Sequence, residues 1–168
     1  MKVDFPDWAG FTPEFAAAEL PRLLDEAEKA VAAIEAAGSG KDSASPLSYE
    51  NFVWKLDDAT RGLWRCWGMV AHMLGVMNSE AWRKVEEDWQ PKIVAFSLRV
   101  SQSKRLYEIA KGLLGSFRVE FGSDRVSVGV CSNDTQDSKD PNATRRRILE
   151  KMVQSAELAG VGLEGAQK

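Results

Sequence analysis

The chain has 168 residues, of which 44% are apolar and 28% are charged, and its formal net charge is −3. These values are typical of a folded globular domain and argue against a disordered chain. A chain of this length can bury about 70% of its unfolded surface in one core. The weak negative charge gives no electrostatic reason to expect nucleic acid or an anionic membrane as a partner. No stretch approaches the roughly 18 apolar residues that a membrane-spanning helix needs.

The first predicted helix begins at Thr12, because Pro13 and Glu14 follow it in the order typical of a helix N-terminus. Apolar residues then recur at spacings of three and four, and this stripe comprises Leu20, Leu23, Leu24, Ala27, Val31 and Ile34. Pro21 lies inside the pattern, so a kink or a restart of the helix is expected there. The helix should end where residues 38–47, a polar linker rich in glycine and serine, begin.

Two further helices have the same periodicity. Ser48 caps the first of them, and its stripe comprises Phe52, Leu56, Ala59, Leu63, Cys66 or Trp67, Val70, Leu74 and Met77. Asn78 and Ser79 form a break with a new cap. The stripe that follows comprises Trp82, Val85, Trp89, Ile93, Phe96 and Val100. Pro91 lies within it, so a kink near Gln90 is expected.

A fourth, shorter helix should begin at Ser103 and carries Leu106, Ile109, Ala110 and Leu113. The segment 115–141 differs from its surroundings, because residues 117–131 alternate apolar and polar side chains around Gly-Ser-Asp, which is typical of a hairpin. We therefore expect an insertion at 115–141, either an irregular loop or an ordered two-stranded hairpin. A fifth helix resumes after Asn142 or Thr144, and its apolar side comprises Ile148, Leu149, Met152, Val153 and Ala156. Gly160 should end that helix.

Helices joined by short connections, with no sustained strand pattern elsewhere, predict an all-α fold. The expected architecture is an antiparallel bundle of about five helices that forms a single domain over residues 1–168.

His72 is the only histidine, which excludes a zinc site that needs two imidazoles one turn apart. Cys66 lies six residues earlier, nearly opposite His72 around a helix, so the two cannot form a site within that helix, although another helix could bring a partner. Beside His72 runs a line of mostly small residues that would let a second helix come close: Trp64, Gly68, Ala71 and Gly75. We therefore interpret His72 as a partly buried side chain hydrogen-bonded to another helix, and not as a catalytic residue.

Two groups of carboxylates lie between the apolar positions of the predicted helices. They are Asp57, Asp58, Glu86, Glu87 and Asp88. We interpret them as surface residues, with an acid/base or metal-binding role as the alternative. The same region contains a cluster of methionines and tryptophans, namely Met69, Met73, Met77, Trp64 and Trp67. Such a cluster could suggest a haem or copper pocket, but its helical spacing favours packing in the core. The run Arg145-Arg146-Arg147 is interpreted as a solvated helix face, with targeting or anion binding as the alternative. Cys66 and Cys131 are far apart in the sequence, which favours reduced thiols in a cytosol-like compartment.

Four stretches of the chain resemble, in order, the N-terminal helical region of the oligopeptidase A/thimet oligopeptidase family of zinc metallopeptidases. They are FTPEFAAAELPRLLDEAE, LSYENFVWKLDD, WGMVAHMLGVMNSEAWRKVEEDWQPKIVAFSLRVSQSKRLYEIAKGLL and RRILEKMVQSAELAGVGLEGAQK, and together they cover most of the chain. The pattern W-x-x-x-x-H-x-x-x-V-x-N-S, followed by QSKRLYEIAKGLL, is the most specific part. The chain is most similar to plant-type or bacterial members.

The resemblance implies an architecture. Members of the family cleave short peptides with one zinc ion, which is bound in a C-terminal catalytic region by two histidines of H-E-x-x-H and a downstream glutamate. Their N-terminal helices form one wall of a deep channel that admits peptides and excludes folded proteins. No position of this chain matches the zinc motif, so the resemblance assigns no catalytic, cofactor-binding or metal residue here, and zinc belongs to the full-length family.

Three features depart from the family pattern. Phe15 stands where many members have histidine, 115–141 is longer than the usual connection, and the chain stops at Lys168 where another helix should begin. We therefore expect a truncated product or an N-terminal fragment that is inactive alone and would contact short peptides only within a complete enzyme. The alternative is a stand-alone helical module that binds a peptide or protein in a groove lined by Trp8, Trp54, Trp64 or Trp82. Self-association through exposed apolar surface and a cytoplasmic location, or an organellar one if a transit peptide is missing, are further expectations.

Overall fold

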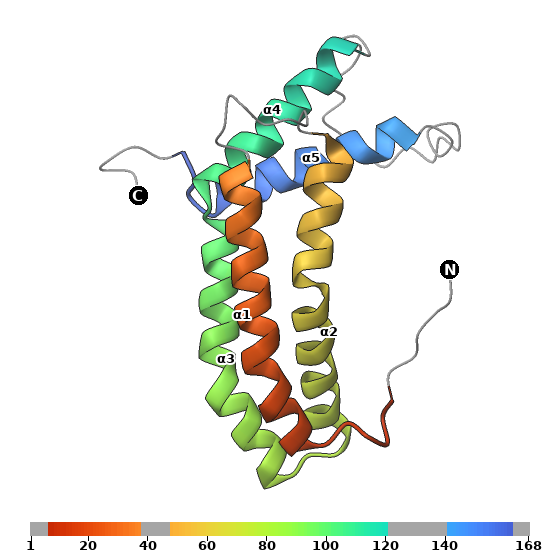
Figure 1. Cartoon of the computed structure of the whole chain (residues 1–168), viewed down its shortest axis with the longest axis vertical. Helices are drawn as coiled ribbons and strands as arrows, with labels where there is room; N and C mark the ends of the chain where they lie inside the picture. Colours follow the sequence, from red (N-terminus) through yellow and green to blue (C-terminus); the bar gives the residue numbers. More distant parts are fainter. Residues whose placement is uncertain (1–6, 38–47, 121–140, 163–168) are drawn as a thin grey trace. The chain divides into compact units, whose positions relative to one another are not determined.

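The computed structural model describes residues 7–37, 48–120 and 141–162. Its elements are α1 (Pro13–Ala37), the π-helical turn η1 (Glu50–Trp54), α2 (Lys55–Val76), α3 (Glu80–Ser101), α4 (Lys104–Glu120) and α5 (Pro141–Leu158), as Figure 1 shows. No strand occurs within these described ranges. The predicted all-α fold with five α-helices is confirmed.

The described residues divide into two compact units. The first contains residues 7–34 and 55–98, and the second contains 35–37, 48–54, 99–120 and 141–162. Each unit is described by itself below. The expectation of a single domain over the whole chain stays a prediction.

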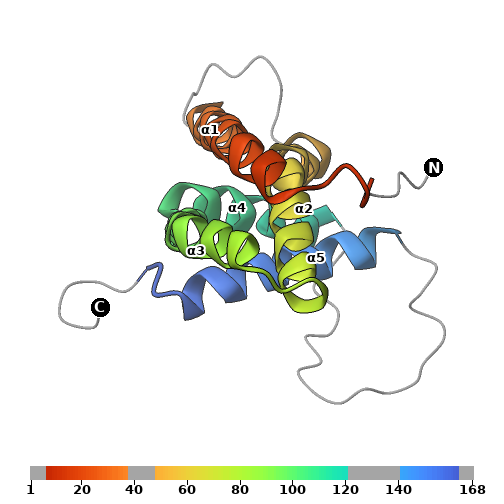
Figure 2. The same cartoon turned by 90° about the horizontal axis from the view of Figure 1, so that it is seen from below.

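The first unit consists of most of α1, α2 and α3, which lie side by side with α2 antiparallel to the other two (Figures 1 and 2). The predicted stripes point into its core, because residues three and four apart share one face of a helix. The buried residues include Leu20, Ala27, Val31, Leu63, Cys66, Val70, Trp82, Val85, Trp89, Ile93 and Phe96. Met77 was predicted to extend the α2 stripe, and this is wrong: it lies beyond the last residue of α2 and is 62% exposed.

Four predicted helix caps are confirmed. In each, a side-chain hydroxyl accepts a hydrogen bond from the backbone N–H three residues later, over 3.1 to 3.3 Å. This satisfies a backbone donor that has no partner within the helix. The capping residues are Thr12, Ser48, Ser79 and Ser103.

Both prolines lie inside continuous helices. α1 runs through Pro21 and α3 runs through Pro91, so the restart expected at Pro21 does not occur. Both prolines are exposed. A proline has no N–H group, so the carbonyl four residues before it lacks its usual hydrogen bond, and at these positions water can supply one. A bend of the axis at either proline stays a prediction.

In the second unit α4 packs against α5 (Figure 1). Its buried residues include Tyr49, Phe52, Leu106, Ile109, Ala110, Leu113, Leu114, Leu149, Ala156 and Val161. The end of α5 confirms the predicted stop at Gly160, which has a φ of 88°. There the N–H of Gly160 donates to the carbonyl of Glu157 and that of Val161 donates to Ala156, each over 3.0 Å. This is the Schellman arrangement that ends a helix.

The start of the predicted insertion is wrong. α4 continues through Gly115 to Glu120, and the hydroxyl of Ser116 donates to the carbonyl of Gly112 over 3.2 Å, as serines do inside a helix. The alternating pattern that suggested a strand therefore begins within a helix that is already formed. The fifth helix also begins slightly earlier than expected, at Pro141. Residues 121–140, including Cys131, lie outside the described residues.

Candidate functional site

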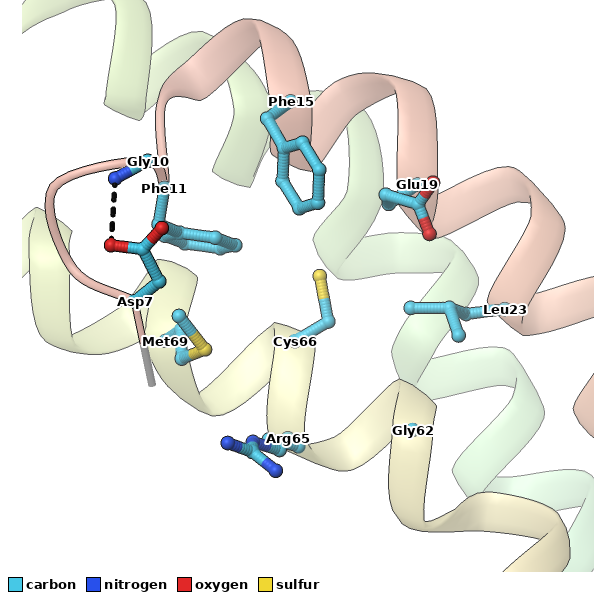
Figure 3. A pocket seen from close by; sticks show the side chains of 10 residues that line it. All are labelled: Asp7, Gly10, Phe11, Phe15, Glu19, Leu23, Gly62, Arg65, Cys66 and Met69. Carbon is cyan, nitrogen blue, oxygen red and sulfur yellow. Dashed lines mark hydrogen bonds between the residues drawn. The ribbon is translucent and has the colours of Figure 1, made fainter. Parts of the chain in front are cut away.

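The first unit contains a cavity of about 280 Å³, which lies between the N-terminal end of α1 and the middle of α2. It is lined by Asp7, Gly10, Phe11, Phe15, Glu19, Leu23, Gly62, Arg65, Cys66 and Met69 (Figure 3). The lining combines apolar side chains with three charged ones. We take it as the candidate site for a small ligand, because its lining is largely apolar with a few charged groups. A second cavity of about 510 Å³ lies between α4 and α5 in the second unit.

The segment that precedes α1 forms one end of the cavity. A carboxylate oxygen of Asp7 accepts a hydrogen bond from the N–H of Gly10 over 3.2 Å and so closes a tight turn. The next residue, Phe11, is only 5% exposed. Its ring stacks on that of Trp82 with centroids 5.5 Å apart and meets the ring of Phe15 edge-on at 5.9 Å. These contacts fix the aromatic end of the cavity.

One row of α1 faces the cavity. Phe15, Glu19 and Leu23 are spaced by four residues and therefore project from the same side of the helix. Figure 3 shows the side chains of Phe15 and Leu23 directed toward Cys66 of α2, with Glu19 between them on α1. Phe15 is 50% exposed although it is a large aromatic residue. At the far end, a Cβ on Gly62 would lie 3.1 Å from a methyl carbon of Leu23, so α1 and α2 approach closely there.

The side of α2 contributes two sulfur atoms. Cys66 is buried and is a free thiol, and Met69, one turn later, is half-buried. Burial, and after it the negative charge of Glu19, raises the pKa of the Cys66 thiol to about 11. The thiol therefore stays protonated near neutral pH and is a poor nucleophile.

The charged residues of the lining are two acids and one base. The guanidinium of Arg22 donates two hydrogen bonds to the Oε2 atom of Glu19, over 2.6 Å and 3.2 Å, and also pairs with Glu26. Asp7 holds the turn at Gly10, and Arg65 already takes part in an interaction of its own. The lining thus carries one more negative charge than positive.

Within residues 7–37, 48–120 and 141–162, no three side chains of His, Cys, Asp or Glu converge as metal ligands would. None of the helices described is both long and apolar enough to cross a membrane.

His72 lies elsewhere in the first unit. It is exposed, and its ring contacts that of Trp8, with centroids 4.9 Å apart. The prediction of a partly buried imidazole is therefore wrong: its neighbour comes from the segment before α1 and is aromatic. The line of small residues beside it is exposed as well, and a Cβ at Gly68 or Gly75 would meet nothing within 4 Å. Trp64, at one end of the line, has a ring contact with another helix, that of Phe96 in α3 with centroids 6.0 Å apart, whereas the positions of Gly68 and Gly75 stay open within the described part of the chain.

Three of the four tryptophans proposed for a binding groove are exposed. Trp8, Trp54 and Trp64 are 43%, 56% and 39% exposed, whereas Trp82 is 4% exposed. The assignment of Trp82 to a groove is therefore wrong, because its ring is covered by Phe11.

Several of the remaining sequence candidates take part in ion pairs. Asp57 and Asp58 both pair with Arg61, as expected of a solvated surface. The expectation for the arginine run needs correction, since Arg145 is half-buried. It pairs with Glu50 over 2.8 Å and covers the ring of Tyr49, and so attaches α5 to η1 within the second unit. Of the methionines, Met69 and Met73 are half-buried.

Sequence reasoning did not find the cavity. Three of its lining residues, Phe11, Phe15 and Met69, lie outside the predicted stripes, whereas Leu23 and Cys66 belong to them. A signal for one of them exists, because an apolar residue directly before a cap, as Phe11 is before Thr12, commonly packs back onto the first turn of the helix.

Comparison with known proteins identifies the family of the chain. The family model for the N-terminal domain of neurolysin/thimet oligopeptidase matches residues 20–121. The chain is 25% identical over 161 residues to a probable cytosolic oligopeptidase A of Arabidopsis thaliana, covering 96% of this chain and 19% of that protein. It is 26% identical over 102 residues to an organellar (chloroplastic/mitochondrial) oligopeptidase A of the same plant, covering 61% of this chain and 10% of the relative.

A bacterial relative shows the same pattern. Oligopeptidase A of Haemophilus influenzae is 26% identical over 117 residues, which cover 70% of this chain and 14% of that protein. The chain thus spans less than a fifth of the length of each of these relatives. Since the family model matches more than half of the chain, the chain belongs to the neurolysin/thimet oligopeptidase N-terminal domain family.

Proposed function

We propose that the chain forms part of the substrate-channel wall of an oligopeptidase A-like zinc metalloendopeptidase that cleaves short peptides, and that it has no peptidase activity by itself. The observation that carries the proposal is the family match over residues 20–121. Three aligned helices of the first unit would supply a rigid surface of the kind that a channel wall requires. In the complete enzyme, zinc would be bound and water activated outside these 168 residues.

The inactivity of the chain follows from its histidine content. A catalytic zinc of this family needs two histidines one turn apart, and this chain has one, His72, which is exposed and contacts Trp8. The buried thiol of Cys66 is protonated near neutral pH, because burial raises its pKa to about 11. Neither residue can replace the missing metal site.

A quenched fluorescent peptide tests the proposal. The purified chain is incubated with the peptide and with added zinc, beside the oligopeptidase A of Haemophilus influenzae as a positive control. We expect cleavage by the control alone. Zinc-dependent cleavage by the chain that persists through a second purification and disappears on chelation would overturn the proposed inactivity.

A second candidate function is a helical module that binds a peptide or protein without catalysis. The observation in its favour is the exposure of Trp8, Trp54 and Trp64, since exposed tryptophans commonly mark binding surfaces. Titration of the isolated chain with pools of short peptides, followed by tryptophan fluorescence, distinguishes the two. Tight, saturable binding by the chain alone supports the module, and its absence supports the channel-wall function.

We also propose that copies of the isolated chain associate through exposed apolar surface. Exposed apolar residues, among them Val76 and Leu158 at 62% and 82% exposure, give the isolated chain surface through which copies could associate. Sedimentation velocity at several concentrations measures this. We propose a cytoplasmic location, with an organelle as the alternative, and a fluorescent fusion of the complete gene product distinguishes them.

A further inference from the structure

We propose that the cavity between α1 and α2 binds a primary ammonium group that carries a compact aromatic or branched apolar body. The apolar body would lie among Phe11, Phe15 and Met69, and the ammonium would pair with the carboxylate of Glu19. This chemistry belongs equally to a free aralkyl amine and to the amino-terminal residue of a peptide. The proposal rests on the cavity alone and does not depend on the peptidase assignment.

The size and lining of the cavity fit the apolar body. A cavity of about 150 Å³ lined by apolar side chains is enough to hold a benzene ring, and this one measures about 280 Å³. Phe11 and Phe15 meet edge-on at 5.9 Å and present an aromatic corner to it. Phe15 is 50% exposed without a ligand, so a ligand placed against its ring would remove apolar surface from water.

The charge of the cavity selects a cation. The acids Asp7 and Glu19 outnumber the one base of the lining, Arg65, and Arg65 is already engaged in an interaction. Glu19 lies between Phe15 and Leu23 on the row of α1 that faces the cavity (Figure 3). Its Oε2 atom accepts both hydrogen bonds that Arg22 donates to Glu19, and Oε1 accepts none from that guanidinium. A carboxylate oxygen at an apolar cavity is a good acceptor for an ammonium group.

The geometry also limits the length of the ligand. The close approach of Gly62 and Leu23 borders one end of the cavity, and Phe11, which stacks on Trp82, borders the other. Phe15 and Glu19 are one helical turn apart on α1, so an ammonium that pairs with Glu19 must follow the apolar body after a short spacer. Phenethylamine meets this requirement, and so does the first residue of Phe-Gly-Gly-amide.

Nuclear magnetic resonance titration tests the proposal on the whole chain. The probes are phenethylamine, N-phenethylacetamide as its neutral analogue, phenylacetate as its anionic analogue, and Phe-Gly-Gly-amide with and without an N-acetyl group. The backbone amides of Gly10 and Gly62 report from the two ends of the cavity. We expect the ammonium probes to shift both amides and to bind about threefold to tenfold more tightly than the neutral ones, which is the range for a partly solvated ion pair.

Two variants of α1 form a matched pair. Arg22 lies between Glu19 and Glu26 and pairs with both, but only Glu19 lines the cavity. Glu19→Gln should therefore remove the preference for the ammonium probes, whereas Glu26→Gln should keep it. Phe15→Ala should weaken all the aromatic probes, because the aromatic corner is lost. Far-ultraviolet circular dichroism of each variant confirms that the helices remain.

The outcomes are distinct. Equal binding of neutral and ammonium probes, equal effects of the two glutamine variants, or shifts confined to amides away from the cavity would each overturn the proposal. Binding of both amines, or of either one alone, supports it and identifies the source of the ammonium. No step measures peptide cleavage, so failure here leaves the proposed peptidase function untouched.

Discussion

The indole ring of Trp8 lies against the imidazole ring of His72, with centroids 4.9 Å apart and planes tilted by 48°. This contact attaches the segment before α1 to the C-terminal part of α2, within the first unit. His72 is the only histidine of the chain. Both residues are exposed, so the contact excludes only part of each ring from water.

The strength of this contact can be measured with a double-mutant cycle. Trp8→Ala and His72→Ala should each lower the free energy of unfolding, with a coupling energy of about 0.5–1 kcal/mol, as is usual for aromatic pairs. Urea denaturation of the two single variants and the double variant gives the coupling. Trp54→Ala, which removes a tryptophan that is 56% exposed, serves as the control and should be near neutral. A coupling of zero would show that the rings do not interact in solution.

Two leucines of α5 differ in burial and offer a matched comparison. Leu149 is 0% exposed and Leu158 is 82% exposed. Leu149→Ala should lower the free energy of unfolding by about 2–5 kcal/mol, because it removes apolar contacts and leaves a cavity. Leu158→Ala should change it by less than about 0.5 kcal/mol. Thermal and urea denaturation measure both, and similar effects of the two variants would contradict the packing of α5 described above.

The features that the sequence predicts well are local ones. A helix cap such as Ser103 requires only a side-chain hydroxyl three residues before a free backbone N–H of the first turn. A buried stripe such as that from Trp82 to Phe96 requires only apolar residues spaced by three and four positions. Both are read from a few neighbouring residues, so the helices and most of their buried faces could be predicted. The predicted break at Gly115 was wrong because a glycine in a helix costs only about 1 kcal/mol, which the rest of α4 can offset.

The cavity could not be predicted in the same way. It depends on how the turn at Asp7 and Gly10 places Phe11 against Trp82, more than 70 positions away in the sequence. Periodicity describes one helix at a time and contains no information on such a contact. The same reason explains His72, since its neighbour Trp8 belongs to no helix.

Two glycines should respond to alanine with opposite signs. Gly160 has a φ of 88°, where a side chain is strained, so Gly160→Ala should lower the free energy of unfolding by about 1 kcal/mol. Gly112 lies in the interior of α4, and a Cβ there would meet nothing within 4 Å. Gly112→Ala should therefore raise the free energy of unfolding by about 0.5–1 kcal/mol, because alanine is the better helix former. Denaturation of both variants measures this, and the same sign for both would contradict the helix boundaries.

The thiol of Cys66 gives the last prediction, on the pH dependence of reactivity and stability. Burial, and then the charge of Glu19, raises its pKa from 9.0 to about 11. In a Cys131→Ser background, only about 0.1% of the folded molecules would carry the reactive thiolate at pH 8. Labelling by a disulfide reagent should therefore be slow in the native chain and fast in urea.

The sign of the effect on stability follows from the same pKa. The folded state holds the proton more tightly than the unfolded state, so this contribution to stability is complete below pH 9 and is lost as the pH rises toward 11. Stability should fall over this interval, and Cys66→Ala should remove that part of the decline although it also costs packing at every pH. Urea denaturation at pH 8, 9.5 and 10.5 measures both chains. Rapid labelling of the native thiol at pH 8, or identical pH profiles for the two chains, would show that Cys66 is not buried as described.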